Sequence, residues 1–385
     1  MKTQLAWRNL IHNKVKTGVA VAGVVFAIVL MFMQLGFLEA VKVSATQIYD
    51  ALDFDVCLRS KDYLHLADAR LFRRQRLVQA QGCPGVQRAA PLTVVRSSWR
   101  NPASGEHQSI LCFGVNPDEA VFSRTDIQTL VSDELERSDA LLIDTKTRRE
   151  FGPVDGRRFG PQDRNAEIEV NGTAVRIAGD YTLGAGLLAG GAMIISERGL
   201  QSVTPTLGGD QVSLGLIKVS RGEDAGAVAG RLQSLLPGDV DVLTRPDVLR
   251  GELDHWVYQT NYGLIFQTGV IVALIVGTAI VYQVLASDVA SLLPEYATLK
   301  AMGYDNRYLG RVILQQALAL AVLGFGVGLV IAELLYAITS AGAQIPVQMT
   351  WRNLALVFVL SVVMCMCSGL AALRKAFRAD PADLF

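Results

Sequence analysis

The residue types that most often carry catalysis occur in this chain, but their spacing supports no catalytic or metal site. Its four histidines are scattered, and the nearest approach to a ligand pair is His107, five residues before Cys112. The glycine-rich run Gly184–Gly191 lacks the lysine of a P-loop and the GxGxxG spacing, so we interpret it as a turn between strands. The chain has no Gly-Lys dipeptide, no GxSxG and no HExxH. We therefore expect a non-catalytic chain that binds no metal and no cofactor itself.

The five cysteines define no disulfide framework. Cys57, Cys83 and Cys112 lie in a stretch of ordinary polarity, and no pair has CxxC spacing. We expect small buried hydrophobic side chains, although one bridge among these three remains an alternative. Cys365 and Cys367 lie two residues apart in an apolar block, so they point to opposite sides of a helix and cannot hold one ion.

Apolar residues are concentrated in four blocks. The chain has 385 residues, of which 51% are hydrophobic and 19% charged, whereas a soluble domain carries about 25% charged residues. The formal net charge is zero, which predicts no nucleic-acid partner. Each block reaches the roughly 20 residues that a helix needs to cross a bilayer, and all its faces are apolar. We predict four transmembrane helices, over Val19–Leu38, Gly263–Ala286, Val312–Ala332 and Leu354–Leu373.

The first block has two interpretations. Val43-Ser-Ala45 faintly resembles a small-residue cleavage site, as in a signal peptide. The apolar core is longer than the roughly 7–15 residues of a signal peptide, which favours an uncleaved membrane anchor.

Basic residues in the short flanks predict the orientation, because cytoplasmic segments carry an excess of lysine and arginine. The short loop between the third and fourth blocks holds only Arg352, whereas three other segments are basic. Those segments carry Lys2, Arg8, Lys14 and Lys16, then Lys300, Arg307 and Arg311, then Arg374, Lys375 and Arg378. We therefore predict that both termini and the loop 287–311 are cytoplasmic, and that residues from about 40 to 260 lie outside.

The stretch between the first two blocks predicts an α+β extracytoplasmic domain. Strand-like runs alternate with turn signals, and helical patterns cover Leu64–Gln81 and Ala225–Leu236. Helical patterns also cover Glu39–Tyr49 and Asp247–Tyr262, which predicts a two-helix stalk next to the membrane. The strand-like runs are Asp55–Leu58, Pro91–Ser97, Ser109–Val115, Glu167–Val170, Ala192–Ser196 and Val212–Val219.

A short amphipathic helix is predicted in the cytoplasmic loop. Pro294 favours a first helical turn, Gly303 fits the left-handed stop, and Asp305 can cap the next helix. Glu295 complements the positive helix start, and Lys300 lies toward the negative end. Its apolar stripe of Leu292, Tyr296, Leu299 and Met302 fits either a helix resting on lipid headgroups or a helix that docks in a groove of a motor protein.

Three further features leave two interpretations each. Ala317, Ala321, Gly324 and Gly328 form a small-residue face that serves either a dimer contact or packing within one bundle. Glu333 is either a solvated boundary residue or a functional acid. The amphipathic segment 1–17, with Trp7, Leu10, Ile11 and Val15 on one face, either anchors at the membrane surface or also touches a partner.

Several motifs carry a resemblance to a known family. The segments Leu293–Tyr304 and Asn306–Leu309 resemble the cytoplasmic loop of DevC-type permeases, which are subunits of ABC exporters in the MacB/FtsX superfamily. The tail Ala379–Phe385 resembles the terminal Asp-Pro-Ala-Asp motif of that family, and Ala6–Leu10 and Ala27–Phe37 resemble its start and first span. Over the external domain the resemblance is looser, with short pieces such as Leu214–Lys218 and Val242–Thr244.

The resemblance implies a permease subunit that couples a separate ATPase to the external domain. ATP and Mg would be bound by the ATPase, and the partners would be a periplasmic membrane-fusion adaptor, an outer-membrane TolC-like channel and a second copy of the chain. It implies a bacterial inner-membrane location. The coupling residues would be Pro294, Glu295, Tyr296, Ala297, Thr298, Leu299, Lys300, Ala301, Met302, Gly303 and Tyr304, with a second cytoplasmic contact at Arg374, Lys375, Asp380 and Pro381.

The expected layout is therefore a membrane α-helical fold with an α+β insertion. Two rival functions remain: an FtsX-like regulator that gates a periplasmic hydrolase, and a membrane receptor, for which the short cytoplasmic segments leave no room for a signalling module. The expected segments are 1–17 amphipathic helix, 18–38 first span, 39–262 external domain with stalk, 263–286 second span, 287–311 coupling loop, 312–333 third span, 334–353 external loop, 354–373 fourth span and 374–385 tail.

Overall fold

A computed structural model describes residues 14–153, 156–186, 188–301, 306–343 and 346–378. The chain forms two compact units. The helical unit holds the residues up to Ala40, then Asn261–Ala343, and those from Val347 onward. The α+β unit holds residues 41–260 together with residues 344–346.

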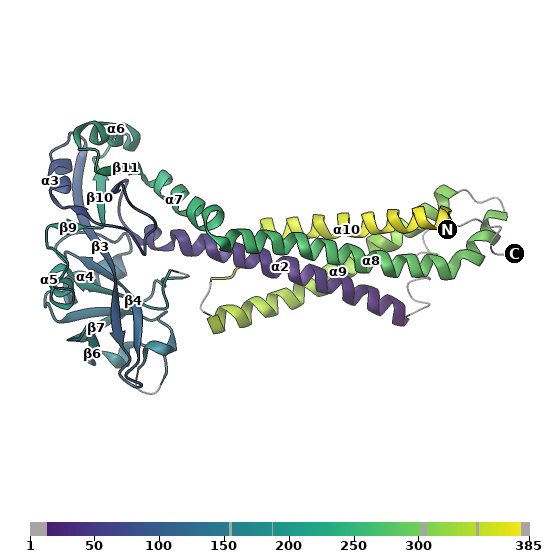
Figure 1. Cartoon of the computed structure of the whole chain (residues 1–385), viewed down its shortest axis with the longest axis horizontal. Coiled ribbons are helices and arrows are strands. Elements are labelled where there is room, and N and C mark those ends of the chain that lie inside the picture. Colours follow the sequence, from purple (N-terminus) through teal and green to yellow (C-terminus); the bar gives the residue numbers. More distant parts are fainter. Residues whose placement is uncertain (1–13, 154–155, 187, 302–305, 344–345, 379–385) are drawn as a thin grey trace. The chain divides into compact units, whose positions relative to one another are not determined.

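The helical unit is made of long apolar helices. They are α2 (Lys14–Ala51), α8 (Asn261–Ala301), α9 (Asn306–Ala343) and α10 (Trp351–Arg378), labelled in Figure 1. All four are long and apolar enough to cross a membrane. Large apolar side chains such as Ile275 and Val330 are 62% and 70% exposed, as contact with lipid tails demands. The prediction of four spanning helices is confirmed.

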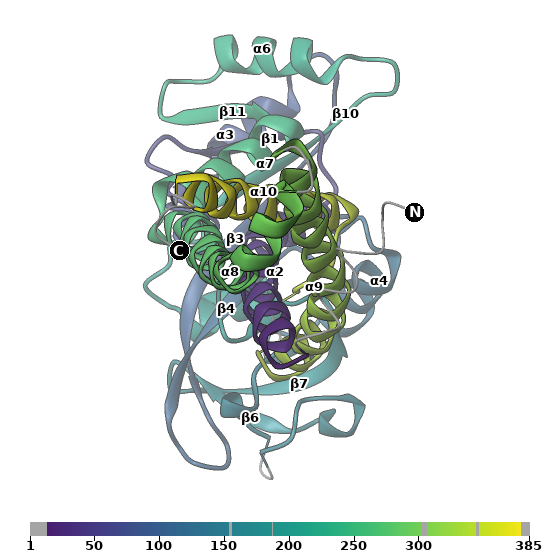
Figure 2. The same ribbon diagram turned by 90° about the vertical axis from the view of Figure 1, so that its right-hand side faces the viewer.

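The helices of this unit lie side by side with alternating chain direction, so α8 and α10 run the same way (Figures 1 and 2). Polar side chains inside the unit find partners on neighbouring helices. The Tyr336 hydroxyl of α9 donates to the Phe32 carbonyl of α2. The Ser368 hydroxyl of α10 donates to the Thr278 carbonyl of α8 at 2.9 Å. Such pairing is needed because hydrocarbon offers no hydrogen-bond partner.

The α+β unit contains one large mixed sheet with the strand order β11-β1-β10-β3-β4-β8-β5-β7-β6. A small pair, β2 and β9, lies apart from it. The strands are β1 Val56–Ser60, β2 Phe72–Arg73, β3 Val86–Arg100, β4 His107–Val115, β5 Ala140–Asp144, β6 Glu167–Val170, β7 Thr173–Tyr181, β8 Ala192–Ser196, β9 Gln211–Val212, β10 Leu214–Val219 and β11 Val240–Thr244. The helices are α3 Gln75–Gln81, α4 Thr125–Glu134, α5 Glu197–Val203, α6 Ala225–Leu235 and α7 Arg245–Asp254.

The long strand β3 belongs to two parts of this sheet. Its first half pairs with β10, and its far end pairs with β6, where Trp99 lies opposite Val170. The ladder β3-β4-β8-β5-β7-β6 therefore closes on itself. Alternate residues such as Ile110, Cys112 and Leu141 join Trp99 in one buried cluster, as the period of two along a strand requires.

Two other clusters cover the remaining faces. Leu77 of α3 and Leu232 of α6 pack with Leu58 of β1 in one of them. The other cluster contains Tyr49 and Leu52 from the end of α2 and residues of α4 and α7. The end of the first spanning helix is therefore part of the core of the α+β unit.

The α+β prediction is confirmed, with corrections in detail. Each predicted strand-like run overlaps a strand, and the predicted helix at Ala225–Leu236 is α6. The prediction of one helix over Leu64–Gln81 is wrong, since only Gln75–Gln81 is helical. Phe72 and Arg73 instead pair with Val212 and Gln211. A distant strand thus overrides the local helical pattern.

All five cysteines are free, which excludes the alternative of a bridge in this structure. Cys57, Cys83 and Cys112 are buried, as expected for small hydrophobic side chains. Burial raises the pKa of the Cys57 thiol to about 12, so it stays protonated and inert.

Candidate force-transmission site

The predicted coupling element lies at the end of α8. The helix runs without interruption from Asn261 through Pro294 to Ala301. The expectation of a separate short helix after Pro294 is therefore wrong for residues 294–301. A proline inside a helix removes one hydrogen bond and bends the chain, but a long helix can continue through it. Met302, Gly303, Tyr304 and Asp305 lie outside the described residues, and α9 begins at Asn306.

The second predicted cytoplasmic contact lies at the end of α10. Arg374 and Lys375 belong to this helix, which ends at Arg378. The Arg374 side chain is exposed. Asp380 and Pro381 lie outside the described residues, as does the amphipathic segment before residue 14.

The small-residue face of α9 packs inside the chain itself. A Cβ at Gly324 would meet the Val24 side chain of α2, and one at Gly328 would meet Ile28 Cγ2 at 2.7 Å. Ala317 and Ala321 are fully buried. These contacts favour packing within one bundle over the dimer alternative for this face. Glu333, on the same helix, is exposed.

The end of α2 is held by a residue that sequence reasoning missed, Arg245. Its Nη1 donates to the Leu52 carbonyl at 3.0 Å, and its Nη2 donates to the Tyr49 carbonyl at 3.1 Å. Its guanidinium also lies 5.0 Å from the centre of the Phe54 ring. The last carbonyls of a helix have no partner within the helix, so this cation satisfies them. Arg245 is the first residue of α7, so the helix that leaves the domain holds the helix that enters it.

A buried acid joins the same two helices. Glu252 of α7 is 1% exposed, and the Tyr63 hydroxyl donates to its Oε1. The Tyr49 hydroxyl of α2 donates to the same oxygen at 3.2 Å. The two hydroxyls lie 2.6 Å apart. Burial raises the pKa of Glu252, and the tyrosine hydrogen bonds and Arg59 only partly oppose it.

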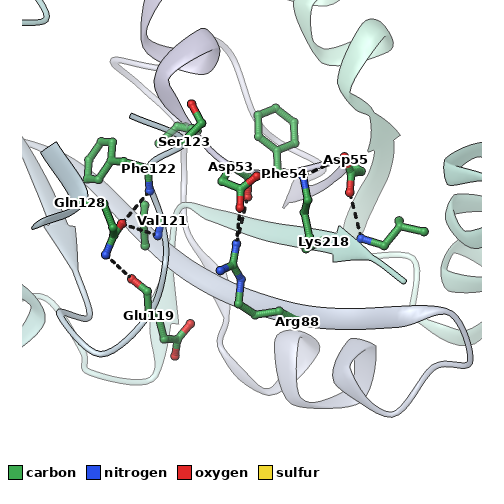
Figure 3. A network of polar contacts seen from close by, with 12 residues as sticks. Asp53, Phe54, Asp55, Arg88, Glu119, Val121, Phe122, Ser123, Gln128 and Lys218 are labelled. Carbon is green, nitrogen blue, oxygen red and sulfur yellow. Dashed lines mark hydrogen bonds and ion pairs between the residues drawn. The ribbon is translucent and has the colours of Figure 1, made fainter. Parts of the chain in front are cut away.

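An ion-pair network fixes the link that follows α2 (Figure 3). Asp53 accepts from Arg88 Nη2 at 2.9 Å and from Lys218 Nζ at 2.8 Å. Asp55 accepts from Lys218 Nζ at 3.3 Å and from the Val219 amide at 3.0 Å. Partial burial opposes ionisation of Asp53, but the hydrogen bonds from Lys218 and Arg88 outweigh it and lower its pKa. The chain leaving α2 is thereby tied to β3 and β10.

The loop that follows β5 and the glycine-rich run that follows β7 pack together, and the run contacts α2 at Ser44 and Gln47. Asp144, 1% exposed, accepts from the amides of Gly184, Lys146 and Leu183 at 2.5, 2.9 and 3.3 Å. Gly186 has φ +55°, and a Cβ there would lie 2.6 Å from Ser44 Cβ of α2. The glycines thus allow a close approach of backbone to a helix. This agrees with the interpretation of the run as a turn between strands.

The structure also brings together two histidines that are distant in sequence. The rings of His65 and His255 stack with centres 5.3 Å apart. Burial and the neighbouring His255 lower the pKa of His65. Among the described residues, no three histidine, cysteine, aspartate or glutamate side chains form a group fit for a metal.

The contacts around α2 and α7 were hard to predict from sequence. Arg245 and its acceptor Leu52 are 193 residues apart, and no local pattern announces their contact. The only signal was that Arg245 precedes Pro246 and Asp247, a helix start. The site is therefore best understood as a joint that binds the two ends of the α+β domain into one rigid piece.

Comparison with known proteins gives a family for the carboxy-terminal part of the chain. Residues 268–381, which include most of α8 and all of α9, match the family model described as FtsX-like permease C-terminal. No curated protein matches the chain.

Two solved structures resemble the chain at low identity. The periplasmic region of MacB from Actinobacillus actinomycetemcomitans has a TM-score of 0.37 and 10% identity, covering 53% of this chain and 94% of that one. The extracellular domain of the noncanonic ABC-type transporter YknZ from Gram-positive bacteria has a TM-score of 0.35 and 14% identity, covering 50% of this chain and 99% of that one. Both TM-scores lie below 0.5, so neither likeness supports an argument here, and the family match applies to residues 268–381.

Proposed function

We propose that this chain, an FtsX-like permease by its residues 268–381, is the membrane subunit of an ABC-type exporter. In this proposal a separate ATPase binds the cytoplasmic ends of the helices and hydrolyses ATP with Mg. Its motion passes along the spans to the α+β domain, which acts with a periplasmic adaptor and a TolC-like outer-membrane channel. The chain works as a homodimer in the bacterial inner membrane, with both termini cytoplasmic.

The observation that carries the proposal is the continuity of α2. A single helix runs from Lys14 to Ala51, and its last turn is clamped by Arg245, Tyr63 and Glu252 in the core of the domain. A continuous helix anchored at its end in this way provides an unbroken path for an axial displacement from the first span. Such a helix suits a machine in which ATP drives an external domain.

The coupling assignment is tested at the end of α8. Glu295→Lys and Gly303→Pro are expected to remove most of the ATPase stimulation by the permease while leaving membrane insertion intact. Lysine at position 295 reverses the charge of the acid in the proposed contact segment and so repels a basic partner surface, and proline at 303 cannot adopt a left-handed conformation. The measurement is ATP hydrolysis by the co-purified ATPase in proteoliposomes.

A matched control is Glu333→Lys, which makes the same charge change on an exposed acid at the other end of α9. It should leave ATPase stimulation unchanged. Unaltered stimulation in both coupling variants would show that residues 294–304 are not the ATPase contact. Labelling of a single cysteine at Lys300 from the external side would contradict the proposed orientation.

The FtsX-like regulator remains the second candidate, because residues 268–381 match a family model named for that permease type. Purification of the membrane complex separates the two. An adaptor that co-purifies with the ATPase supports export, whereas a peptidoglycan hydrolase in its place supports regulation.

A further inference from the structure

A groove of about 520 Å³ opens between α8 and α10. Both helices are long and apolar enough to span a membrane, and the residues that line the groove lie within these candidate spans. Its walls include Leu274, Ile275 and Ala279 of α8 and Ala371 of α10. Among the described residues, no acidic side chain lines it.

The groove is apolar at one end and polar at the other. Since α8 and α10 run in the same direction, later residues of both lie toward the same face of the membrane. Leu274 and Ile275 line the earlier end, and Tyr282 and Arg374 line the later end. Tyr282 follows Leu274 by eight positions, which is roughly 12 Å along the helix. That length matches part of an acyl chain below a headgroup.

Two hydroxyl groups in the middle of the groove already have backbone acceptors on α8 and α10. The Ser368 hydroxyl donates to the Thr278 and Met364 carbonyls at 2.9 Å, and the Thr278 hydroxyl donates to the Leu274 carbonyl at 2.7 Å. The donors that remain for a ligand are the Arg374 guanidinium and the Tyr282 hydroxyl. Within the described part of the chain, neither forms a hydrogen bond or ion pair.

We propose that this groove binds one anionic phospholipid, with its phosphate on Arg374 and Tyr282 and an acyl chain along Leu274, Ile275 and Ala371. A guanidinium pairs with phosphate oxygens in a bidentate way, and tyrosine favours the headgroup level. The small side chains of Ala279 and Ala371 leave the space that the acyl chain fills. With the orientation proposed above, the lipid belongs to the cytoplasmic leaflet.

The charge contact is tested by native mass spectrometry of the full chain in detergent. Phosphatidylglycerol and phosphatidylcholine with the same acyl chains are added in separate titrations. We expect the wild type to retain phosphatidylglycerol more strongly. Arg374→Gln should lower this retention about fivefold, the usual contribution of one cation near a headgroup. Arg352→Gln, at another exposed arginine at the opposite end of α10, should leave it unchanged.

The shape of the groove is tested by filling it. Ala371→Trp should abolish retention of phosphatidylglycerol, whereas Leu370→Trp, next to it but not lining the groove, should preserve it. Equal retention of the two lipids, or equal losses in the two arginine variants, overturns the proposal. So does cross-linking of Ala371→Cys to a second copy in membranes of a Cys367→Ser background, since a subunit would then fill the groove. No nucleotide or ATPase is present, so these outcomes leave the proposed function untouched.

Discussion

The two connections between the helical unit and the α+β unit are built differently. The first is α2, one uninterrupted helix that contains both a membrane-spanning segment and core residues of the domain. The second runs from α7 through a π-helical turn at His255–Gln259 and the extended residue Thr260 into α8 at Asn261. One connection is a continuous rod, and the other contains a break.

This difference assigns different tasks to the two connections under the proposed function. A continuous helix transmits displacement along its axis, whereas a few residues at the end of an element can absorb changes of φ and ψ. Because Arg245 and Glu252 tie α7 to the end of α2, the two helices move together at the domain. Any difference between the motions of the first and second spans must then be absorbed at residues 255–260.

The largest expected effect comes from placing proline in each connection. Thr46→Pro lies inside α2, where proline removes a hydrogen bond and clashes with the preceding turn, at about 3 kcal/mol or more. We expect a large drop in the unfolding temperature and loss of ATPase stimulation. Asn261→Pro lies at the first position of α8, after the extended residue Thr260, where proline is favourable. It should retain both properties.

The control for this pair is Thr46→Ala, which keeps the helix and should behave like the wild type. Thermal unfolding and ATP hydrolysis are measured on the same reconstituted samples. If Asn261→Pro were as harmful as Thr46→Pro, the second connection would be no more tolerant than the first. The comparison would then fail.

A smaller effect is expected from Arg245→Gln. It removes charged donors from carbonyls at the end of α2 and the contact with Phe54, which should lower the free energy of unfolding by about 2 kcal/mol. Hydrogen exchange should rise in the segment 49–54. Arg250→Gln, on the same helix but 70% exposed and paired with the exposed Asp247, should change stability by about 0.5 kcal/mol or less. Similar values for the two variants would mean that Arg245 does not hold α2.

Features encoded by local patterns were predicted well from the sequence. The four spanning helices follow from long apolar runs without charges, and strands such as β4 and β8 follow from short β-branched and apolar runs. The turn at Gly184–Gly191 was predicted from its glycine content and from the missing P-loop lysine and GxGxxG spacing. These features depend on residues near one another in the chain.

Features set by distant contacts were missed. The strand pairing of Phe72 and Arg73 with β9 overrides a helical pattern, and the clamp of Arg245 on α2 joins residues almost two hundred positions apart. Pro294 misled the prediction for a different reason, because a proline is a good helix start but is also tolerated within a long helix. A local sequence pattern shows which secondary structures a segment can adopt, and contacts with distant residues determine which of them forms.

The smallest expected effect is on the pH dependence of stability, which should differ in sign between Glu252 and Asp53. Burial raises the pKa of Glu252, so the folded state holds a proton that the unfolded state has released between the ordinary carboxyl pKa and the raised one. The contribution of Glu252 to stability is therefore fully present below the ordinary carboxyl pKa and is lost as pH rises through the raised pKa. Asp53 has a lowered pKa, so its contribution is lost as pH falls instead.

Glu252→Gln should therefore remove the decline in unfolding temperature as pH rises above the ordinary carboxyl pKa. It should leave the decline at lower pH unchanged. The amide keeps an oxygen that accepts from Tyr63 and Tyr49 but carries no proton that titrates. Asp53→Asn should do the reverse, flattening only the loss on acidification. Unfolding temperatures of the full chain from about pH 4 to 8 bracket the ordinary carboxyl pKa. An unchanged alkaline slope in Glu252→Gln would mean that the acid between α2 and α7 is ionised in the folded chain, and that the tyrosines hold a carboxylate there.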